Sequence, residues 1–288
     1  MYNRIVITGG SGFLGSYLRN RFAKTDCQII NLDKSEGYDI TKKQSFDALG
    51  SFDCIIHLAA ETFVPESWTR PYDFYNLNIN GTLNVLEVAK KHNAKTILLS
   101  SYLYGEPDYL PIDELHPLKP HNPYAHSKFL CEKLAQAYYT DFNTPIVILR
   151  PFNIYGIGQN KHFIIPEIVN QLFTGKVKLK DPRPKRDFIH VIDVAEVIYN
   201  IAFTDIKGFE IFNIGSGKSH SIEDIIKYFK FLAKIPFEVS FTNEFRPNEV
   251  LDCVADISKI KTKLDWQPKI SLESGLMELY NNKILYNE

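Results

Sequence analysis

The chain has 288 residues, of which 44% are hydrophobic and 23% are charged, and its formal net charge is -1. This composition is that of a folded globular protein and excludes disorder as the dominant state. The balance of 33 Lys and Arg against 34 Asp and Glu gives no general attraction for nucleic acid or for an anionic membrane. We therefore expect neither as a partner, so any anionic ligand must bind at a local site.

The cysteines and the N-terminus indicate a cellular location. Four cysteines are scattered along the chain, with no Cys-x-x-Cys pair and no histidine cluster at metal-ligand spacing. No apolar run reaches the roughly 18 residues that a membrane span needs, and residues 1–7 lead directly into a glycine turn without a cleavage pattern. We predict a soluble, unprocessed cytoplasmic protein without a metal site.

Short apolar runs rich in β-formers alternate with longer helical patterns in the first half of the chain. The predicted strands cover residues 4–8, 28–32, 54–58, 96–100 and 145–149. This alternation is typical of an α/β doubly wound sheet, whose parallel strands are buried on both faces. Before the fourth strand, helical spacing over residues 78–91 predicts a crossover helix with Asn80 as its N-cap.

The first predicted strand runs directly into a glycine-rich turn, Thr8-Gly9-Gly10-Ser11-Gly12-Phe13-Leu14-Gly15. Glycines at this spacing allow a tight turn, a close approach of the backbone to a pyrophosphate, and packing of the next helix on the strand. The N-terminus of that helix, predicted from Phe13, then faces the phosphates. The turn predicts an NAD(P)-binding Rossmann sheet, with a flavodoxin-like turn as the alternative. The predicted contacts are Gly9, Gly12, Phe13, Leu14 and Gly15.

The second predicted strand ends at Asp33, at about the distance from the glycine turn expected of a ribose-binding carboxylate. A carboxylate accepts hydrogen bonds from ribose hydroxyls and repels a 2′-phosphate, so Asp33 favours NAD, although Lys34 beside it leaves NADP open. Asp39 and Ile40 are assigned to the adenine side, with a solvated loop as the alternative for Asp39. Small residues after the third strand complete the predicted cofactor contacts: Leu58, Ala59 and Ala60.

The sequence changes character beyond residue 151, where glycines and prolines divide it into short elements. We predict a Rossmann NAD(P)-binding domain over residues 1–155 and a smaller α/β substrate-binding subdomain over residues 156–288. Residues 186–207 combine a strand end with a helix, and they are predicted to return to the first domain.

Tyr124 and Lys128 are four residues apart and therefore share one face of the helix that Asn122-Pro123 is predicted to start. A lysine ammonium stabilises a phenolate, so we predict a lowered pKa for Tyr124 and a role as general base. Ser100 ends an earlier parallel strand, where open sheets bind their ligands, and would hydrogen-bond the same substrate oxygen. We interpret His57 as a core histidine.

Several motifs occur in an order that resembles the extended short-chain dehydrogenase/reductase family, in particular its nucleotide-sugar epimerases and dehydratases. The motifs are Thr8 to Gly15, His57-Leu58-Ala59-Ala60, Asn78-Ile79-Asn80-Gly81-Thr82, Ser100-Ser101-Tyr102-Leu103-Tyr104-Gly105, Tyr124 to Lys128, Arg150-Pro151-Phe152-Asn153, Arg186-Asp187-Phe188-Ile189-His190 and Arg246-Pro247. The resemblance implies that Tyr124 and Lys128 also contact the nicotinamide. It places the catalytic hydroxyl at Ser100, with Ser101 as the fallback.

The same resemblance implies a nucleotide-diphosphate sugar as the substrate. It assigns Asn153 and Arg246 to the diphosphate, with Arg186 as a weaker candidate and Glu249 near the nucleoside ribose. An arginine fork suits a diphosphate, and an asparagine can donate to phosphate without adding charge. For Arg246, a plain surface charge is the alternative. The resemblance also implies a homodimer, formed through the helices around residues 80–91 and 124–139.

The pattern departs from the family's 4,6-dehydratases directly after the catalytic position. These enzymes carry an Asp-Glu pair there, whereas this chain has Ser101-Tyr102, which we assign to contacts with the sugar. Because neither side chain supplies the acid and base that water elimination needs, we expect no dehydration. The remaining interpretations are a 4-epimerase, favoured by Asp33 through NAD, and a 4-keto-(6-deoxy)sugar reductase. A non-catalytic cofactor-binding regulator is the third, and the intact Tyr124 and Lys128 pair argues against it.

Overall fold

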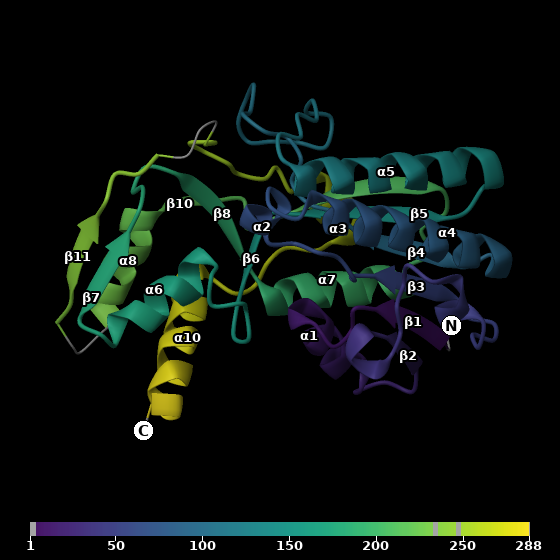
Figure 1. Ribbon diagram of the computed structural model, residues 1–288, viewed down its shortest axis with the longest axis horizontal. Helices are drawn as coiled ribbons and strands as arrows, with labels where there is room; N and C mark the ends of the chain where they lie inside the picture. The colour runs from purple at the N-terminus through teal and green to yellow at the C-terminus, as the bar shows by residue number, and fades with distance from the viewer. Residues whose placement is uncertain (1–3, 233–235, 246–248, 288) are drawn as a thin grey trace. The chain divides into compact units, whose positions relative to one another are not determined.

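The structure is a computed structural model that describes residues 4–232, 236–245 and 249–287 (Figure 1). The chain divides into two compact units, each built from segments that are separated in the sequence. Unit 1 consists of Met1–Gly105, Pro117–Pro151 and Val194–Asn213. Unit 2 consists of Glu106–His116, Phe152–Asp193 and Ile214–Glu288.

Unit 1 is an α/β structure around one sheet. Its strands are β1 (Arg4–Thr8), β2 (Gln28–Leu32), β3 (Cys54–His57), β4 (Lys95–Leu99), β5 (Ile146–Pro151) and β9 (Phe209–Ile214). Its helices are α1 (Phe13–Phe22), η1 (Lys34–Glu36), η2 (Lys43–Phe46), α2 (Val64–Ser67), α3 (Pro71–Tyr75), η3 (Asn76–Asn80), α4 (Gly81–His92), α5 (Pro123–Phe142) and α7 (Val191–Phe203), whose first three residues are assigned to unit 2.

The six strands follow the order β2-β1-β3-β4-β5-β9. The pairs β1 with β2, β1 with β3, β3 with β4 and β4 with β5 are all parallel, so that Ile5 lies between Ile29 and Cys54. Ile5, Ile55 and Ile148 have no exposed surface. These observations confirm the predicted parallel sheet buried on both faces. The sixth strand, β9, is an addition to the five that the sequence predicts.

Helices cover both faces of this sheet. Figure 1 shows α4 and α5 on one face and α1 and α7 on the other. On the first face, Leu86 of α4, Cys131 of α5 and Ile148 of β5 belong to one apolar cluster. On the second face, the Phe22 ring of α1 lies 5.1 Å from the Tyr199 ring of α7, measured between centroids. Burial of these apolar side chains is the main stabilising contribution to the unit.

Lys95, the first residue of β4, is buried and ties α7 to the sheet. Its Nζ donates hydrogen bonds to the carbonyl oxygens of Ile201 at 2.6 Å, Ala202 at 3.0 Å and Thr204 at 2.8 Å. A helix ends with unpaired carbonyl groups and a partial negative charge, so an ammonium group is a suitable partner. Lys95 thus gives hydrogen-bond donors to three carbonyl groups at the end of α7, and these carbonyl groups give acceptors to its buried ammonium.

The crossover helix begins earlier than the sequence predicts. Helix α3 starts with Pro71 at its first turn and continues through the π-helical turn η3 into α4. Asn80 is therefore already helical, with φ −67° and ψ −36°, and its side chain makes no cap hydrogen bond. The predicted N-cap at Asn80 is wrong, because the backbone is helical from Pro71. The π-helical turn buries Asn78, which bears on the site below.

Unit 2 contains two small sheets and four helices among the described residues. Its strands are β6 (Asn153–Tyr155), β7 (Lys176–Leu179), β8 (Lys185–His190), β10 (Ser219–Ser221) and β11 (Glu238–Phe241), paired in the orders β10-β8-β6 and β11-β7. Its helices are α6 (Ile164–Leu172), α8 (Ile222–Leu232), α9 (Ser258–Leu264) and α10 (Leu272–Asn287). Ile168, Phe229 and Leu276 are fully buried in its core. In the part of the chain that the structure describes, none of the helices is long and apolar enough to cross a membrane.

Candidate active site

The glycine turn after β1 leaves no room for side chains. Gly9 has φ +72°, and a Cβ there would lie 2.7 Å from the backbone nitrogen of Ala59. A Cβ on Gly15 would lie 2.4 Å from the carbonyl oxygen of Gly9. Both contacts are closer than real Cβ atoms come, so the tight strand-turn-helix packing requires glycine at each position.

Helix α1 follows this turn and begins without a side-chain cap. Its N-cap is Gly12, which offers no hydrogen-bonding side chain to the first turn. The backbone N–H groups of Phe13, Leu14 and Gly15 therefore point outward from an uncapped, partially positive helix end. Such an end is suited to a pyrophosphate, so these residues fit the NAD(P) dinucleotide that the sequence predicts.

Asp33, directly after β2, is held by backbone and hydroxyl donors. Its Oδ2 accepts a hydrogen bond from Ser11 N at 3.0 Å, and its Oδ1 accepts from Ser35 N at 2.9 Å and Ser35 Oγ at 2.7 Å. Partial burial acts to raise the pKa of Asp33, but the hydrogen bonds from Ser35 and Ser11 outweigh it and lower that pKa. The carboxylate is thus ionised at neutral pH.

Asp39 and Ile40 lie in the loop between η1 and η2. The Asp39 carboxylate accepts hydrogen bonds from Thr41 Oγ1 at 2.7 Å and Thr41 N at 3.0 Å, and these bonds lower its pKa. The Ile40 side chain is buried in the core of unit 1, and its carbonyl accepts a hydrogen bond from Asn84 Nδ2 at 2.9 Å. The structure therefore places the Ile40 side chain in the core rather than at a ligand surface.

His57, the last residue of β3, is buried with both ring nitrogens bonded. Its Nδ1 lies 2.7 Å from Thr8 Oγ1, and its Nε2 lies 3.0 Å from Thr82 Oγ1. Burial lowers the pKa of His57 to about 3, so the ring is neutral near pH 7. This is the core histidine expected from the sequence. The half-buried residues that follow it, Leu58, Ala59 and Ala60, pass beside the glycine turn at Gly9.

Helix α5 presents the tyrosine and the lysine. It begins at Pro123, and Asn122 caps it by accepting a hydrogen bond from Ala125 N at 2.8 Å. Tyr124 is half-buried, and its ring meets Phe74 edge to face at 6.4 Å between centroids. Lys128, one helical turn later, is only 4% exposed. The predicted helix start is confirmed.

The pKa of Tyr124 is shifted in the direction opposite to the sequence-based prediction. Burial raises the pKa of Tyr124 to about 12, and a hydrogen bond with Ser101 offsets only part of that rise. Burial also lowers the pKa of Lys128. The tyrosine pKa is therefore raised and not lowered as the sequence predicts, because desolvation of the phenolate outweighs the favourable interactions.

Two serines follow β4 at this position, and they differ in their bonding. Ser100 is 3% exposed, and its Oγ has no hydrogen-bond partner among the residues that the structure describes. Ser101 instead forms a hydrogen bond with the Tyr124 hydroxyl. A buried hydroxyl without a partner among these residues is unusual in a folded protein, and it leaves Ser100 able to bond a ligand atom. Tyr102 is half-buried beside them.

A buried ionic network adjoins the pair, and the sequence analysis missed it. Arg150 at the end of β5 donates to the Glu132 carboxylate of α5 at 3.0 and 2.7 Å, and to Tyr104 Oη at 3.0 Å. Tyr104 Oη in turn donates to Asn213 Oδ1 of β9. The available signal was Glu132, because it lies four residues beyond Lys128 on the same buried helix face and requires a positive partner.

A second missed residue is Asn78 in the π-helical turn η3. Its Nδ2 donates to Ser127 Oγ at 2.8 Å and to the Glu61 carbonyl at 3.2 Å, and its Oδ1 accepts from Glu61 N at 2.9 Å. Asn78 thereby joins the segment after β3 to the residue next to Lys128. No sequence signal indicated this role, since it depends on the π-helical turn.

The predicted diphosphate ligands belong to unit 2. Asn153 is half-buried, and its Nδ2 donates to the Asp187 carbonyl at 3.3 Å. Arg186 forms an ion pair with Glu249 and donates to the Val250 carbonyl at 2.6 Å, so an anion would have to compete with Glu249. Arg246 lies outside the described residues.

The parallel sheet, the uncapped glycine turn, and the tyrosine and lysine on one helix define a dinucleotide-dependent α/β enzyme of the dehydrogenase type. The model of the NAD dependent epimerase/dehydratase family matches residues 5–215. The chain belongs to this family, whose members depend on NAD(P).

Known relatives align over almost the full length. A putative UDP-glucose 4-epimerase of Methanocaldococcus jannaschii is 31% identical, with 96% of this chain and 97% of the relative covered. A GDP-6-deoxy-D-mannose reductase of Pseudomonas aeruginosa is 28% identical, with 98% and 97% covered. The crystal structure of the UDP-glucose 4-epimerase of Thermotoga maritima with UDP-glucose superimposes with a TM-score of 0.90, at 25% identity, with 98% and 99% covered.

Proposed function

We propose that the protein is an NDP-hexose 4-epimerase that acts through a transient 4-keto sugar. The observation that carries this proposal is the buried Ser100 hydroxyl, which lacks a partner among the described residues and precedes Ser101, the residue that bonds the Tyr124 hydroxyl one helical turn before the buried Lys128. The 28% identity to the UDP-glucose 4-epimerase of Bacillus subtilis over 93% of the chain supports the same reaction. Ser101 and Tyr102 provide no carboxyl group, which argues against elimination of water.

In this proposal, Tyr124 accepts the proton of the sugar C4 hydroxyl and later returns it. The Ser100 hydroxyl donates a hydrogen bond to the same C4 oxygen. When bound, NAD(P) supplies the hydride acceptor and donor and a cationic nicotinamide ring. Since burial raises the pKa of Tyr124 to about 12, the phenolate needs positive charge nearby, and the buried Lys128 on the same helix face is the chain's own source.

The proposed reaction also requires contacts with the sugar ring and the diphosphate of the substrate. Ser101 and Tyr102 follow Ser100 and are assigned to the sugar ring. Asn153, Arg186 and Arg246 are assigned to the diphosphate. For Arg186 this requires that the diphosphate replaces Glu249 as the partner of the guanidinium.

A 4-keto-sugar reductase is the second candidate. The 28% identity to a GDP-6-deoxy-D-mannose reductase over 98% of the chain favours it specifically. In that reaction Tyr124 would donate its proton to the C4 oxygen once, and the oxidised dinucleotide would have to leave. The two reactions use the same residues and differ in their net redox change.

The deciding experiment incubates the purified enzyme with UDP- and GDP-hexoses and follows the C4 configuration by proton NMR. We expect a 4-epimer to form without net oxidation or reduction of the dinucleotide. Consumption of NADPH with a 4-keto sugar, and no epimer from any hexose, would replace the epimerase by the reductase. Formation of a 4-keto-6-deoxy product would contradict both assignments and the expected absence of dehydration.

We also propose a homodimer and a cytoplasmic location. The helices α4 and α5 expose the apolar side chains Leu83, Leu130 and Phe142, which a second copy could cover. All four cysteines are free thiols, which fits a reducing compartment. A monomeric mass in light scattering at working concentrations would contradict the dimer.

A further inference from the structure

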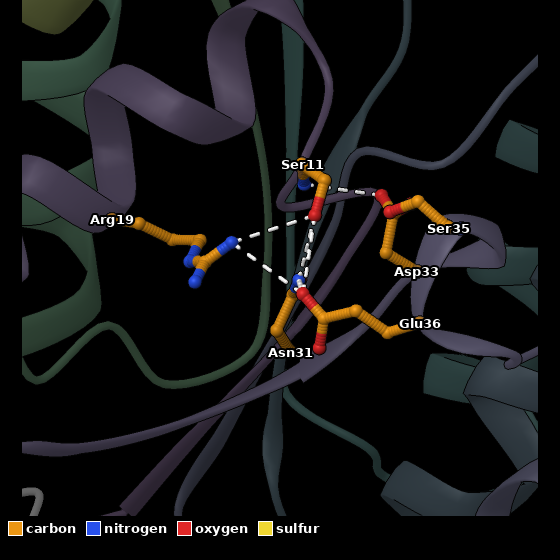
Figure 2. A network of polar contacts seen from close by, with 6 residues as sticks. All are labelled: Ser11, Arg19, Asn31, Asp33, Ser35 and Glu36. Atoms are coloured by element: carbon orange, nitrogen blue, oxygen red, sulfur yellow. Dashed lines mark hydrogen bonds and ion pairs between the residues drawn. The ribbon is translucent and has the colours of Figure 1, made fainter.

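A polar network extends from Asp33 to the surface of α1 (Figure 2). We call it the Asp33 cluster, and it consists of Ser11, Arg19, Asn31, Asp33, Ser35 and Glu36. Ser11 joins its two carboxylates, because the Ser11 N–H donates to Asp33 Oδ2 at 3.0 Å and the Ser11 hydroxyl donates to Glu36 Oε1 at 3.2 Å. A group bound by Asp33 would therefore lie close to Glu36.

The cluster contains one guanidinium group, and Glu36 holds it. Arg19 Nη1 lies 3.6 Å from Glu36 Oε1 and 3.4 Å from Ser11 Oγ. Both charged side chains are about two-fifths exposed, at 43% and 42%, so a ligand can reach them. A guanidinium is the side chain best suited to a phosphate, and this one is already paired with a carboxylate.

Glu36 is fixed in place from a second side by Asn31 at the end of β2. Asn31 Nδ2 donates both to Glu36 Oε1 and to Ser11 Oγ, the latter at 3.0 Å. Gly10 makes room for this amide, since a Cβ there would lie 2.2 Å from Asn31 Oδ1. The position of Glu36 thus depends on a dedicated strand residue and on a glycine of the turn.

We propose that Glu36 determines the choice of NAD over NADP by holding Arg19. The proposal rests on the proposed function in one respect, that a dinucleotide binds at the glycine turn with its adenosine ribose at Asp33. A 2′-phosphate there would meet two carboxylates and a guanidinium whose charge Glu36 already neutralises. The ribose hydroxyls of NAD need only an acceptor, which Asp33 supplies.

The test is Glu36→Gln, with the dissociation constants of NAD+ and NADP+ measured by isothermal titration calorimetry. Release of Arg19 is expected to lower the dissociation constant of NADP+ about tenfold, the size of one charge-assisted hydrogen bond. The dissociation constant of NAD+ should change less than about twofold, since Asp33 remains. In the same background, Arg19→Gln should abolish the gain, whereas Lys24→Gln, at an exposed cation just after α1 and outside the Asp33 cluster, should keep it.

An unchanged NADP+ affinity in E36Q with normal NAD+ binding would overturn the proposal, as would a gain that survives Arg19→Gln. Loss of NAD+ binding in E36Q would give Glu36 a structural role and overturn it as well. Failure of the wild-type protein to bind either dinucleotide would overturn the proposed function together with this inference. If instead NAD+ binds but no epimer forms, only the reaction assignment fails, and the expected response of E36Q still decides the inference.

Discussion

We define the Tyr124 cluster as Ser100, Ser101, Tyr124 and Lys128. The Asp33 cluster and the Tyr124 cluster differ in burial, in the direction of their pKa shifts and in their hydrogen bonding. In the Asp33 cluster, hydrogen bonds lower the pKa of a carboxylate near the surface, and both of its oxygens are bonded by the chain itself. In the Tyr124 cluster, burial raises the pKa of Tyr124, lowers that of Lys128, and leaves the Ser100 hydroxyl without a partner among the described residues.

This difference matches the proposed roles of the two clusters, which are cofactor binding at the Asp33 cluster and proton transfer at the Tyr124 cluster. A surface site can be stable by itself and exchange its own hydrogen bonds for those of a ligand at little cost. At a buried site with perturbed pKa values and an unbonded hydroxyl, a ligand that bonds these groups lowers the free-energy cost of their burial. We therefore expect substitutions in and around the Tyr124 cluster to have much larger effects than substitutions in the Asp33 cluster.

The largest effect is expected for Tyr124→Phe. Loss of the hydroxyl assigned to transfer the C4 proton should lower kcat by about 10² to 10⁴, the usual range for general acid-base catalysis. The affinity for the nucleotide sugar, measured by calorimetry, should stay nearly unchanged, because the ring remains in place. Near-full turnover by this variant would show that Tyr124 is not the base, and it would contradict the proposed difference between the two clusters.

The next effect is expected for Glu132→Gln, next to the Tyr124 cluster. This change leaves the buried Arg150 guanidinium without its counter-charge, which should lower the free energy of unfolding by about 3 to 5 kcal/mol in urea denaturation. The matched control is Glu36→Gln in the exposed Asp33 cluster, where the change should stay below about 1 kcal/mol. Equal effects at the two positions would contradict the comparison.

The smallest effect concerns the pH dependence of stability. The folded-state pKa of His57 is lowered to about 3, below the ordinary value of about 6.5, so the unfolded chain binds a proton that the folded chain does not. His57 should therefore cost no stability above pH 6.5 and remove about 1.4 kcal/mol per pH unit between pH 6 and 4. Asp33, whose pKa is lowered, contributes stability that is lost only at more acidic pH.

Urea denaturation at several pH values measures this slope. His57→Gln should reduce the slope between pH 6 and 4 by the value expected for one proton, whatever its effect on stability at pH 7. An unchanged slope in H57Q would show that His57 is not the neutral, buried group described above.

Local sequence signals predicted the first half of the fold well. The bounds of β1 and β2, the start of α1 at Phe13 and the start of α5 at Pro123 agree with the prediction, because apolar runs, glycine and proline act over a few positions. The predicted cap at Asn80 is wrong because it, too, was based on a local signal. A cap signal is local, and here the helical backbone already began at Pro71.

The candidate site shows where sequence reasoning ends. Spacing brought Tyr124 and Lys128 together, but the direction of the pKa shift depends on burial, which spacing does not contain. The Glu132 and Arg150 pair joins residues of α5 and β5, and its geometry follows from the packing of both elements. The role of Asn78 depends on the π-helical turn, and the Asp33 cluster depends on where α1 places Arg19 relative to η1.

The three carbonyl groups bonded by Lys95 lie far along the chain from it. The ribosome makes β4 about a hundred residues before it makes the end of α7, because the hydrogen-bond partners of Lys95 are residues 201, 202 and 204. The sixth strand, β9, is also made only at residues 209–214. At roughly 5 to 20 residues per second, a nascent chain has an unpaired sheet edge and a Lys95 without these three hydrogen bonds for several seconds. The translation rate over residues 152–214 therefore determines the time before unit 1 can add α7 and β9 to its sheet.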